Sequence, residues 1–307
     1  MKRLSSLLAI ALFLAPVYAE STSSTYVQRI QAERNQQEAA VRSKDGFLSY
    51  IGSYRLKEGE NRVGAGASNE IRLPAGSAPD QVGTFDLANG RVTFTSAAPG
   101  LVSLDGQGVG TADLSGNKPR PSARLSVGRL QLFYRLSADL EHRVFISDPQ
   151  SPSFSSFHGL DWYPVDAGWR IQGKFVPHSS PRKIVYENAL GGSNIATYAG
   201  DVSFTRNGRE YRLEAEKENQ KLFVLFSDAT SGKSTFGGGR ELEIETGEGD
   251  AAILDFNQAV NKPCAVNPYT ACSLSPSQNR LGFEVTAGEK IPRIAVKRVA
   301  AAPQRIR

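Results

Sequence analysis

Short apolar runs separated by glycine, proline, asparagine and aspartate constrain this chain more than any other feature. They begin at Phe47 and continue to Thr286 without a helical periodicity of 3.6 residues. Runs of this length and spacing are typical of strands in sandwiches and barrels. The expected strands lie at 47–56, 70–73, 82–87, 91–95, 101–104, 123–127, 131–136, 143–146, 169–176, 183–187, 222–226, 241–245, 252–256 and 281–286. The sequence therefore predicts a mainly β fold.

One hairpin can be predicted in full register. In DVSFTRNGREYRLEAE, residues 201–216, Asn207-Gly208 is the preferred two-residue turn. Counting outward from the turn pairs Arg206 with Arg209, Phe204 with Tyr211 and Val202 with Leu213. The apolar members then share one face, so turn chemistry and hydrophobic pattern agree.

The segment before these strands is different. Residues 20–44 are polar and rich in Gln, Glu and Arg, with a weak apolar stripe of Val27, Ile30 and Val41. We expect a short helix capped at Ser23, Ser24 or Thr25. Two β domains follow, a sandwich over 45–150 and a barrel or sandwich over 151–295, with a Pro- and Ser-rich connection at 148–156. The sequence shows no internal repeat.

Residues 1–19 read as a secretory signal. Lys2 and Arg3 precede an apolar run at 4–14 that is too short to span a bilayer, and Val17-Tyr18-Ala19 suits cleavage before Glu20. No later stretch is long and apolar enough for a membrane helix. We therefore expect a soluble periplasmic or secreted protein after cleavage following Ala19. The basic residues at 296–307 read as a solvated tail.

Charge and composition exclude several function classes. The formal net charge of +5 falls further when Lys2 and Arg3 are removed, so the sequence gives no argument for nucleic acid. The three histidines are widely separated and there are only two cysteines, so the sequence does not suit a metal centre. We expect no cofactor. The sequence makes no prediction about oligomeric state.

Several stretches carry a family resemblance. They are residues 45–87, GLDWYPVDAGWRIQGKFVP at 159–177, FSDATSGKSTFGGGRELEIE at 226–245 and LDFNQAVNKPCAVNPYTACSLSPSQNRLGFEVTAGEK at 254–290. Together they resemble the bacterial domain of unknown function 1684. The resemblance implies the same two-part layout, and it implies no activity.

The first β domain also resembles forkhead-associated phosphopeptide modules. The motif residues are Gly59-Glu60-Asn61-Arg62-Val63-Gly64 and Asn69-Glu70-Ile71-Arg72-Leu73. Glu60 stands where that family has Arg, and residues 77–81 replace its Ser-Arg-x-x-His motif. The resemblance thus implies the shape of a sandwich and not phosphothreonine binding.

The only two cysteines lie close together, at Cys264 and Cys272. In an oxidising compartment this spacing favours a disulfide that closes the loop between them. On a chain-entropy model such a bridge contributes about 2–3 kcal/mol. The alternative is a reactive thiol pair, for which a nearby histidine or cation is needed.

Polar side chains gather around this loop and in the preceding motif. The candidate ligand-binding residues are Lys233, Arg240, Asp255, Asn257, Tyr269, Asn279 and Arg280, and Asp228 and Asn261 belong to the same stretches. Asp255 and Asn257 alternate on an expected strand, and Arg240 or Arg280 is the expected partner of the Asp255 carboxylate. Such a cluster fits a binding site or a structural network equally well.

Two weaker constellations remain. His158 and Asp161 can form a general base and its orienting carboxylate, beside Ser153, Ser155 and Ser156. Ser231-Gly232-Lys233-Ser234 resembles part of a P-loop but lacks its first glycine, so a turn is the better interpretation. Trp162, Tyr163 and Trp169 are expected to pack where the second domain begins.

The prediction for function is a non-catalytic exported protein that binds a small anionic or sugar-like molecule in its second domain. One alternative is a hydrolase with Asp255, or His158 with Asp161, as general base. The other is a structural envelope protein in which the polar cluster only stabilises the fold.

Overall fold

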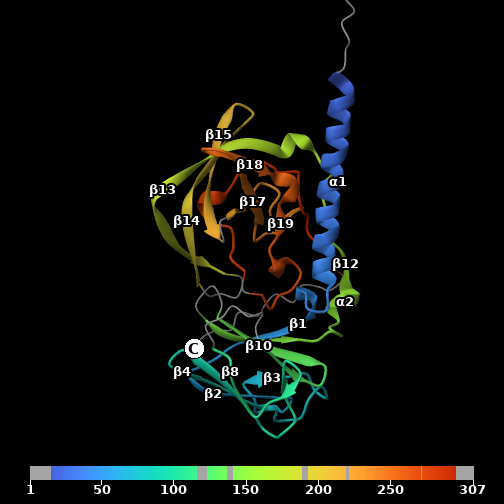
Figure 1. Ribbon diagram of the computed structural model, residues 1–307, viewed down its shortest axis with the longest axis vertical. Helices are drawn as coiled ribbons and strands as arrows, with labels where there is room; N and C mark the ends of the chain where they lie inside the picture. Colours follow the sequence, from blue (N-terminus) through green and yellow to red (C-terminus); the bar gives the residue numbers. More distant parts are fainter. Residues whose placement is uncertain are drawn as a thin grey trace, which may run out of the picture.

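The computed structural model describes residues 15–115, 123–136, 141–188, 193–218, 221–270 and 272–294. In these ranges the chain is mainly β, as predicted, with a sandwich in the first half and a closed barrel in the second (Figure 1). The predicted signal segment lies largely outside these ranges, since only its residues 15–19 are described. The predicted basic tail lies wholly outside them. Within the described ranges, no helix is long and apolar enough to cross a membrane.

The first half forms a sandwich of two sheets around one core. The six-stranded sheet has the order β1 (Tyr50–Arg55), β11 (His142–Ser147), β10 (Leu130–Leu136), β9 (Arg124–Val127), β6 (Ser103–Leu104), β7 (Gln107–Gly108). The five-stranded sheet has the order β3 (Ile71–Arg72), β2 (Gly59–Gly64), β4 (Gly83–Ala88), β5 (Arg91–Ser96), β8 (Thr111–Asp113). Alternate residues of both sheets, among them Val63, Phe85, Phe94 and Leu132, are buried between them, which is the packing that a sandwich requires.

The second half is a barrel closed by six antiparallel strands. Their order is β16 (Lys221–Phe226), β15 (Arg209–Glu218), β14 (Ser193–Arg206), β13 (Arg170–Glu187), β18 (Ala251–Asp255), β17 (Arg240–Thr246), and β17 pairs back to β16. A short β19 (Val260–Asn261) pairs beside β17. Closure leaves none of the six strands as a free edge. The segments 169–176 and 183–187, expected as two strands, form the single long β13 with an irregularity between Pro177 and Arg182.

The predicted hairpin is confirmed in register. Arg206 pairs with Arg209, Phe204 with Tyr211 and Val202 with Leu213. Asn207 and Gly208 both have positive φ, as a two-residue turn of this kind requires. The Phe204 and Tyr211 rings stack at 5.6 Å between centroids on the core side of the barrel.

The N-terminal helix differs in extent and in the face it buries. Helix α1 (Ala15–Arg42) runs along the side of the barrel (Figure 1), so Ser23–Thr25 lie inside the helix and do not cap it. Val27, expected on the buried stripe, is exposed, and Ile30 and Val41 are buried. The buried face instead carries Tyr26, Ile30, Arg34 and Glu38, four residues apart, which point in one direction on a helix. A mostly polar face thus holds α1 in place.

Short elements lie between the strands of the second half and at its junction with the first. They are η1 (Phe47–Ser49), α2 (Ser153–Ser156), β12 (Phe157–Gly159), η2 (Ala167–Trp169), η3 (Phe256–Gln258), η4 (Pro263–Ala265), η5 (Ser277–Asn279) and β20 (Arg293–Ile294). Val41, Leu48, Phe157 and Leu160 form a small apolar cluster here, with Val266 against it. The Pro- and Ser-rich connection is ordered in part by the buried Asp148, which accepts hydrogen bonds from Arg129.

One expected strand is absent. Residues 281–286 form no strand, although Leu281 and Val285 are buried in the barrel core as their pattern requires. The backbone groups of this segment form hydrogen bonds outside any strand pair. The Val285 carbonyl accepts a hydrogen bond from the Arg240 side chain, and the Phe283 carbonyl accepts one from the Ala229 backbone N–H. The hydrophobic pattern was informative about burial and wrong about secondary structure.

Candidate functional site

Arg240 is sealed at one end of the barrel. It begins β17 on the same inward face as Leu242 and Ile244, and its guanidinium lies over the Phe226 ring. Its Nη2 donates to the Asp228 carboxylate at 2.7 Å and to the Val285 carbonyl at 3.0 Å, and Nη1 donates to the Ala287 carbonyl. Burial lowers the pKa of Arg240, and the Asp228 carboxylate opposes that shift. The side chain is therefore committed to internal partners.

Asp228 completes this network from the adjacent loop. Its Oδ1 accepts the Thr230 backbone N–H at 2.6 Å. The turn that follows contains Ser231-Gly232-Lys233-Ser234, with Gly232 at φ 81° and its N–H donating to the Thr235 carbonyl. This is the turn expected in place of a P-loop, and Lys233 is exposed on it.

Asp255 and Asn257 lie together elsewhere, under α1. β18 ends at Asp255, which caps η3 by accepting the Asn257 N–H at 3.2 Å, so the two residues do not alternate on a strand. The Tyr26 hydroxyl donates to both carboxylate oxygens, at 2.8 and 2.9 Å, and Asn257 Nδ2 donates to Oδ1 at 3.1 Å. The cations near this buried carboxylate are Arg29 at 3.6 Å and Arg170 at 3.8 Å, not the expected Arg240 or Arg280.

The helix seals this position. Arg34 Nη1 donates to the Tyr163 carbonyl at 2.9 Å and Nη2 to the Asn257 carbonyl at 3.2 Å. Burial, followed by the hydrogen bond to Asp255, raises the pKa of Tyr26, so its hydroxyl stays a donor. Asp255 has no open path to a substrate while α1 is in place.

The other candidates lie apart from these two networks. Asn279 is buried, where Nδ2 donates to the carbonyls of Glu214 and Leu225 and Oδ1 accepts the Glu214 N–H, so it fastens β15 to β16. Arg280 is exposed, and Tyr269 is partly exposed on the cysteine loop. The predicted cluster is therefore contiguous in sequence but divided in space.

His158 and Asp161 are not brought into a catalytic arrangement. His158 is exposed on β12, and Asp161 forms an ion pair with Lys290 at 3.1 Å. In the described part of the chain no hydrogen bond joins the two side chains. The nearby Ser155 and Ser156 hydroxyls donate to the Pro152 carbonyl.

A buried carboxyl that the sequence analysis did not single out is Glu289. It accepts the backbone N–H of Asn261 at 2.8 Å. Burial raises the pKa of Glu289 to about 7. Over the described residues, no group of three or more His, Cys, Asp or Glu side chains is placed to hold a metal ion.

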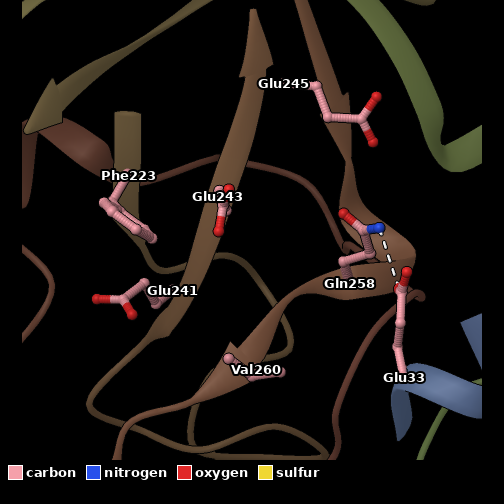
Figure 2. A pocket seen from close by; sticks show the side chains of 7 residues that line it. All are labelled: Glu33, Phe223, Glu241, Glu243, Glu245, Gln258 and Val260. Carbon is pink, nitrogen blue, oxygen red and sulfur yellow. Dashed lines mark hydrogen bonds between the residues drawn. The ribbon is translucent and has the colours of Figure 1, made fainter. Parts of the chain in front are cut away.

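A hollow of about 480 Å³ lies on the outer wall of the barrel beside α1. Figure 2 shows its lining: Glu241, Glu243 and Glu245 from β17, Phe223 from β16, Val260 from β19, Gln258 from η3 and Glu33 from α1. Because Leu242 and Ile244 fill the core, the alternation in β17 turns its three glutamates outward. Gln258 Nε2 donates to Glu33 at 3.1 Å, which joins the helix to this wall.

Each carboxylate of the hollow already has a cation. Glu33 pairs with Arg29 at 2.8 Å, Glu243 with Lys221 at 2.8 Å and Glu245 with Arg170 at 2.9 Å. Glu241 pairs with Lys262. Burial acts to lower the pKa of this lysine, but the Glu241 carboxylate, with Cys272 and Glu216, raises it overall. The carboxylate oxygens that line the hollow can therefore still accept hydrogen bonds, while the neighbouring cations balance most of their negative charge.

Sequence reasoning missed the hollow although part of its signal was present. The run Glu241-Leu-Glu-Ile-Glu245 alternates with period two, which predicts an acidic outer face on a strand with an apolar inner face. Glu33 and Phe223 had no such signal, because only the fold brings them to that strand.

The two cysteines are free thiols in the structure, Cys264 partly exposed and Cys272 buried. The backbone N–H of Cys264 points at Cys272 Sγ at 3.0 Å. The hydrogen bond between the thiols raises the pKa of Cys264 and lowers that of Cys272. The disulfide stays a prediction.

Comparison with known proteins gives a family and no activity. Residues 155–290 match the family model described as Protein of unknown function (DUF1684). The chain is also similar to an uncharacterized protein from Haloarcula marismortui, solved by solution NMR. The two are 30% identical over 44% of this chain and 78% of that one, with a TM-score of 0.38. No curated protein matched.

Proposed function

The chain belongs to the DUF1684 family, whose function is unknown, and we propose from its geometry that it binds a small sugar-like molecule in the hollow beside β17. The observation that carries this proposal is the chemistry of the lining. Four carboxylates and the Gln258 carbonyl oxygen offer hydrogen-bond acceptors, next to the ring of Phe223. A ligand must therefore supply donors and one apolar face, and a sugar ring supplies both.

The charges around the hollow favour some hydrogen-bond donors over others as ligands. Arg29, Arg170, Lys221 and Lys262 balance most of the charge of the four carboxylates, and Arg29 and Arg170 also lie near Asp255, so a bound molecule needs hydroxyl donors more than it needs charge. An anionic ligand is disfavoured, since it would lie against those carboxylates. Of the two ligand classes expected from the sequence, the sugar-like one is therefore retained.

The positions of the candidate general bases favour binding over catalysis. Asp255 is fully buried under Tyr26, and His158 and Asp161 are not hydrogen-bonded to each other. We assign the Arg240–Asp228 and Asp255–Asn257 networks to stability of the barrel and to attachment of α1. The sequence of residues 1–19 supports action outside the cytoplasm.

The test is a thermal-shift and calorimetric screen with neutral oligosaccharides, with polyamines and sugar phosphates as comparison sets. We expect neutral sugars to raise Tm, and Phe223→Ala and Glu243→Gln to weaken their binding by about tenfold or more. Glu248→Gln is the matched control, because Glu248 lies on the exposed turn between β17 and β18. Stabilisation by polyamines or sugar phosphates without any by neutral sugars would overturn the proposal.

A further inference from the structure

We propose that Cys264 and Cys272 form a reversible thiol–disulfide switch that tightens the joint between the barrel and the sandwich. The switch is independent of the proposed sugar site. It rests on two observations: the backbone N–H of Cys264 lies against the sulfur of Cys272, and the loop between the two cysteines contacts the sandwich.

The two cysteines lie beside each other. The Cys264 N–H points at Cys272 Sγ at 3.0 Å, and the Thr270 hydroxyl lies 3.5 Å from the same sulfur. The Cys264 thiol, the Cys264 backbone N–H and the nearby Lys262 ammonium favour a thiolate at Cys272. Cys264 is the more exposed of the two, so it offers the point of entry for an oxidant.

The reaction balances with a small disulfide compound as oxidant. The Cys264 sulfur gives its proton to Cys272 as it attacks the compound, forming a mixed disulfide and releasing one thiolate, which takes up a proton from water. Cys272 then loses that proton to solvent and, as a thiolate, attacks Cys264 Sγ; the second thiolate of the compound leaves and takes up a proton from water. Starting from the Cys264 thiol and the Cys272 thiolate, the protein gives up two electrons and one proton, solvent supplies the second proton, and the oxidant becomes two thiols. A reducing dithiol reverses the reaction.

The loop between the cysteines is the contact point with the sandwich. Asn267, which is buried, donates from Nδ2 to the carbonyl of Tyr50 in β1 at 2.8 Å. The loop holds Asn267 in turn, because its Oδ1 accepts the Tyr269 N–H and its carbonyl accepts the Thr270 hydroxyl. Val266 packs against the apolar cluster that contains Val41 and Leu48. A bridge across this loop therefore restricts the segment that joins the two halves.

The experiment equilibrates the full chain in glutathione buffers of stepped potential, alkylates free thiols and identifies the modified cysteines by mass spectrometry. We expect both cysteines to be alkylated in reducing buffer and neither in oxidising buffer, with no disulfide-linked dimer formed. Hydrogen exchange should slow by about tenfold or more for amides at 265–270 in the oxidised form. In Cys264→Ser the exchange should not depend on the buffer.

Three results would overturn the switch. They are alkylation of both thiols in the most oxidising buffer, disulfide-linked dimers in place of an internal bridge, and a bridge that leaves exchange at 265–270 unchanged. The bridge should also slow exchange at the Tyr50 end of β1, which Asn267 contacts, and Asn267→Ala should form the bridge without this second effect. This separates closure of the loop from its effect on the joint.

Discussion

The guanidinium of Arg240 and the carboxylate of Asp228 meet at 2.7 Å inside the barrel, with only 1% and 0% of the two side chains exposed. Both belong to the same motif stretch, 226–245, yet neither side chain is open to solvent. Removing one member of such a buried pair is costly, because the charge that remains is neither paired nor solvated. The pair also holds residues 285–287, whose carbonyls have no strand partner.

We therefore predict that Asp228→Ala destabilises the protein by about 3–5 kcal/mol in urea unfolding. Adding Arg240→Ala to that variant should cost less than the sum of the two single changes, since the second removes the stranded charge. Arg62→Ala is the control, because Arg62 forms an exposed pair with Glu70 at 2.9 Å and should change stability little. Equal effects at the two sites would contradict the structural role of Arg240.

The sequence predicted most of the fold, but it grouped candidate site residues that the structure separates into different networks. Local rules were sufficient where pattern and turn chemistry agreed, as at Asn207-Gly208, whose register is correct to the residue. They were not sufficient at 281–286, because the side chain of Arg240, about 40 residues earlier in the chain, provides the hydrogen bonds that a strand neighbour would have supplied. Secondary structure there depends on a tertiary contact.

A tertiary contact also explains why Asp255 pairs with Tyr26 and not with Arg240. The sequence shows which polar residues are close along the chain, and it does not show which of them α1 covers. The partner of Asp255 is Tyr26, 229 residues away, on a helix whose weak apolar stripe of Val27, Ile30 and Val41 did not include it. A helix held by polar contacts has little hydrophobic periodicity from which its buried face can be predicted.

Tyr26 provides a direct test of that attachment. Tyr26→Phe keeps the ring and removes the hydroxyl that both Asp255 oxygens accept, so we expect a loss of about 1–3 kcal/mol. Limited proteolysis should cut α1 faster in this variant than in the parent protein. Val27→Ala, one residue along on the exposed face, should leave both measurements unchanged. Equal proteolysis of the two variants would show that α1 is held elsewhere.

Two glycines with positive φ should respond differently to alanine. Gly208 has φ 73°, and no atom lies within 4 Å of the position that a Cβ would take, so Gly208→Ala should cost about 1 kcal/mol from backbone strain alone. Gly239 has φ 93°, and a Cβ there would lie 2.6 Å from the Phe226 carbonyl oxygen. We expect Gly239→Ala to cost more, because Phe226 and Gly239 adjoin the paired ends of β16 and β17 that close the barrel. Thermal unfolding of both variants measures the difference.

Glu289 should make stability depend on pH in a direction opposite to that of most carboxylates. Burial raises its pKa from 4.5 to about 7, so between these values the folded protein binds more protons than the unfolded chain. Stability from this group is therefore present below pH 4.5 and declines as pH rises towards 7, by at most about 1.4 kcal/mol per pH unit. Glu289→Gln keeps an acceptor for the Asn261 N–H and carries no titrating proton. Relative to the parent protein, the variant should become more stable as pH is raised from about 5 to about 8 in urea unfolding. Parallel stability curves for the two proteins over this range would contradict the assignment, because any other titrating group contributes equally to both.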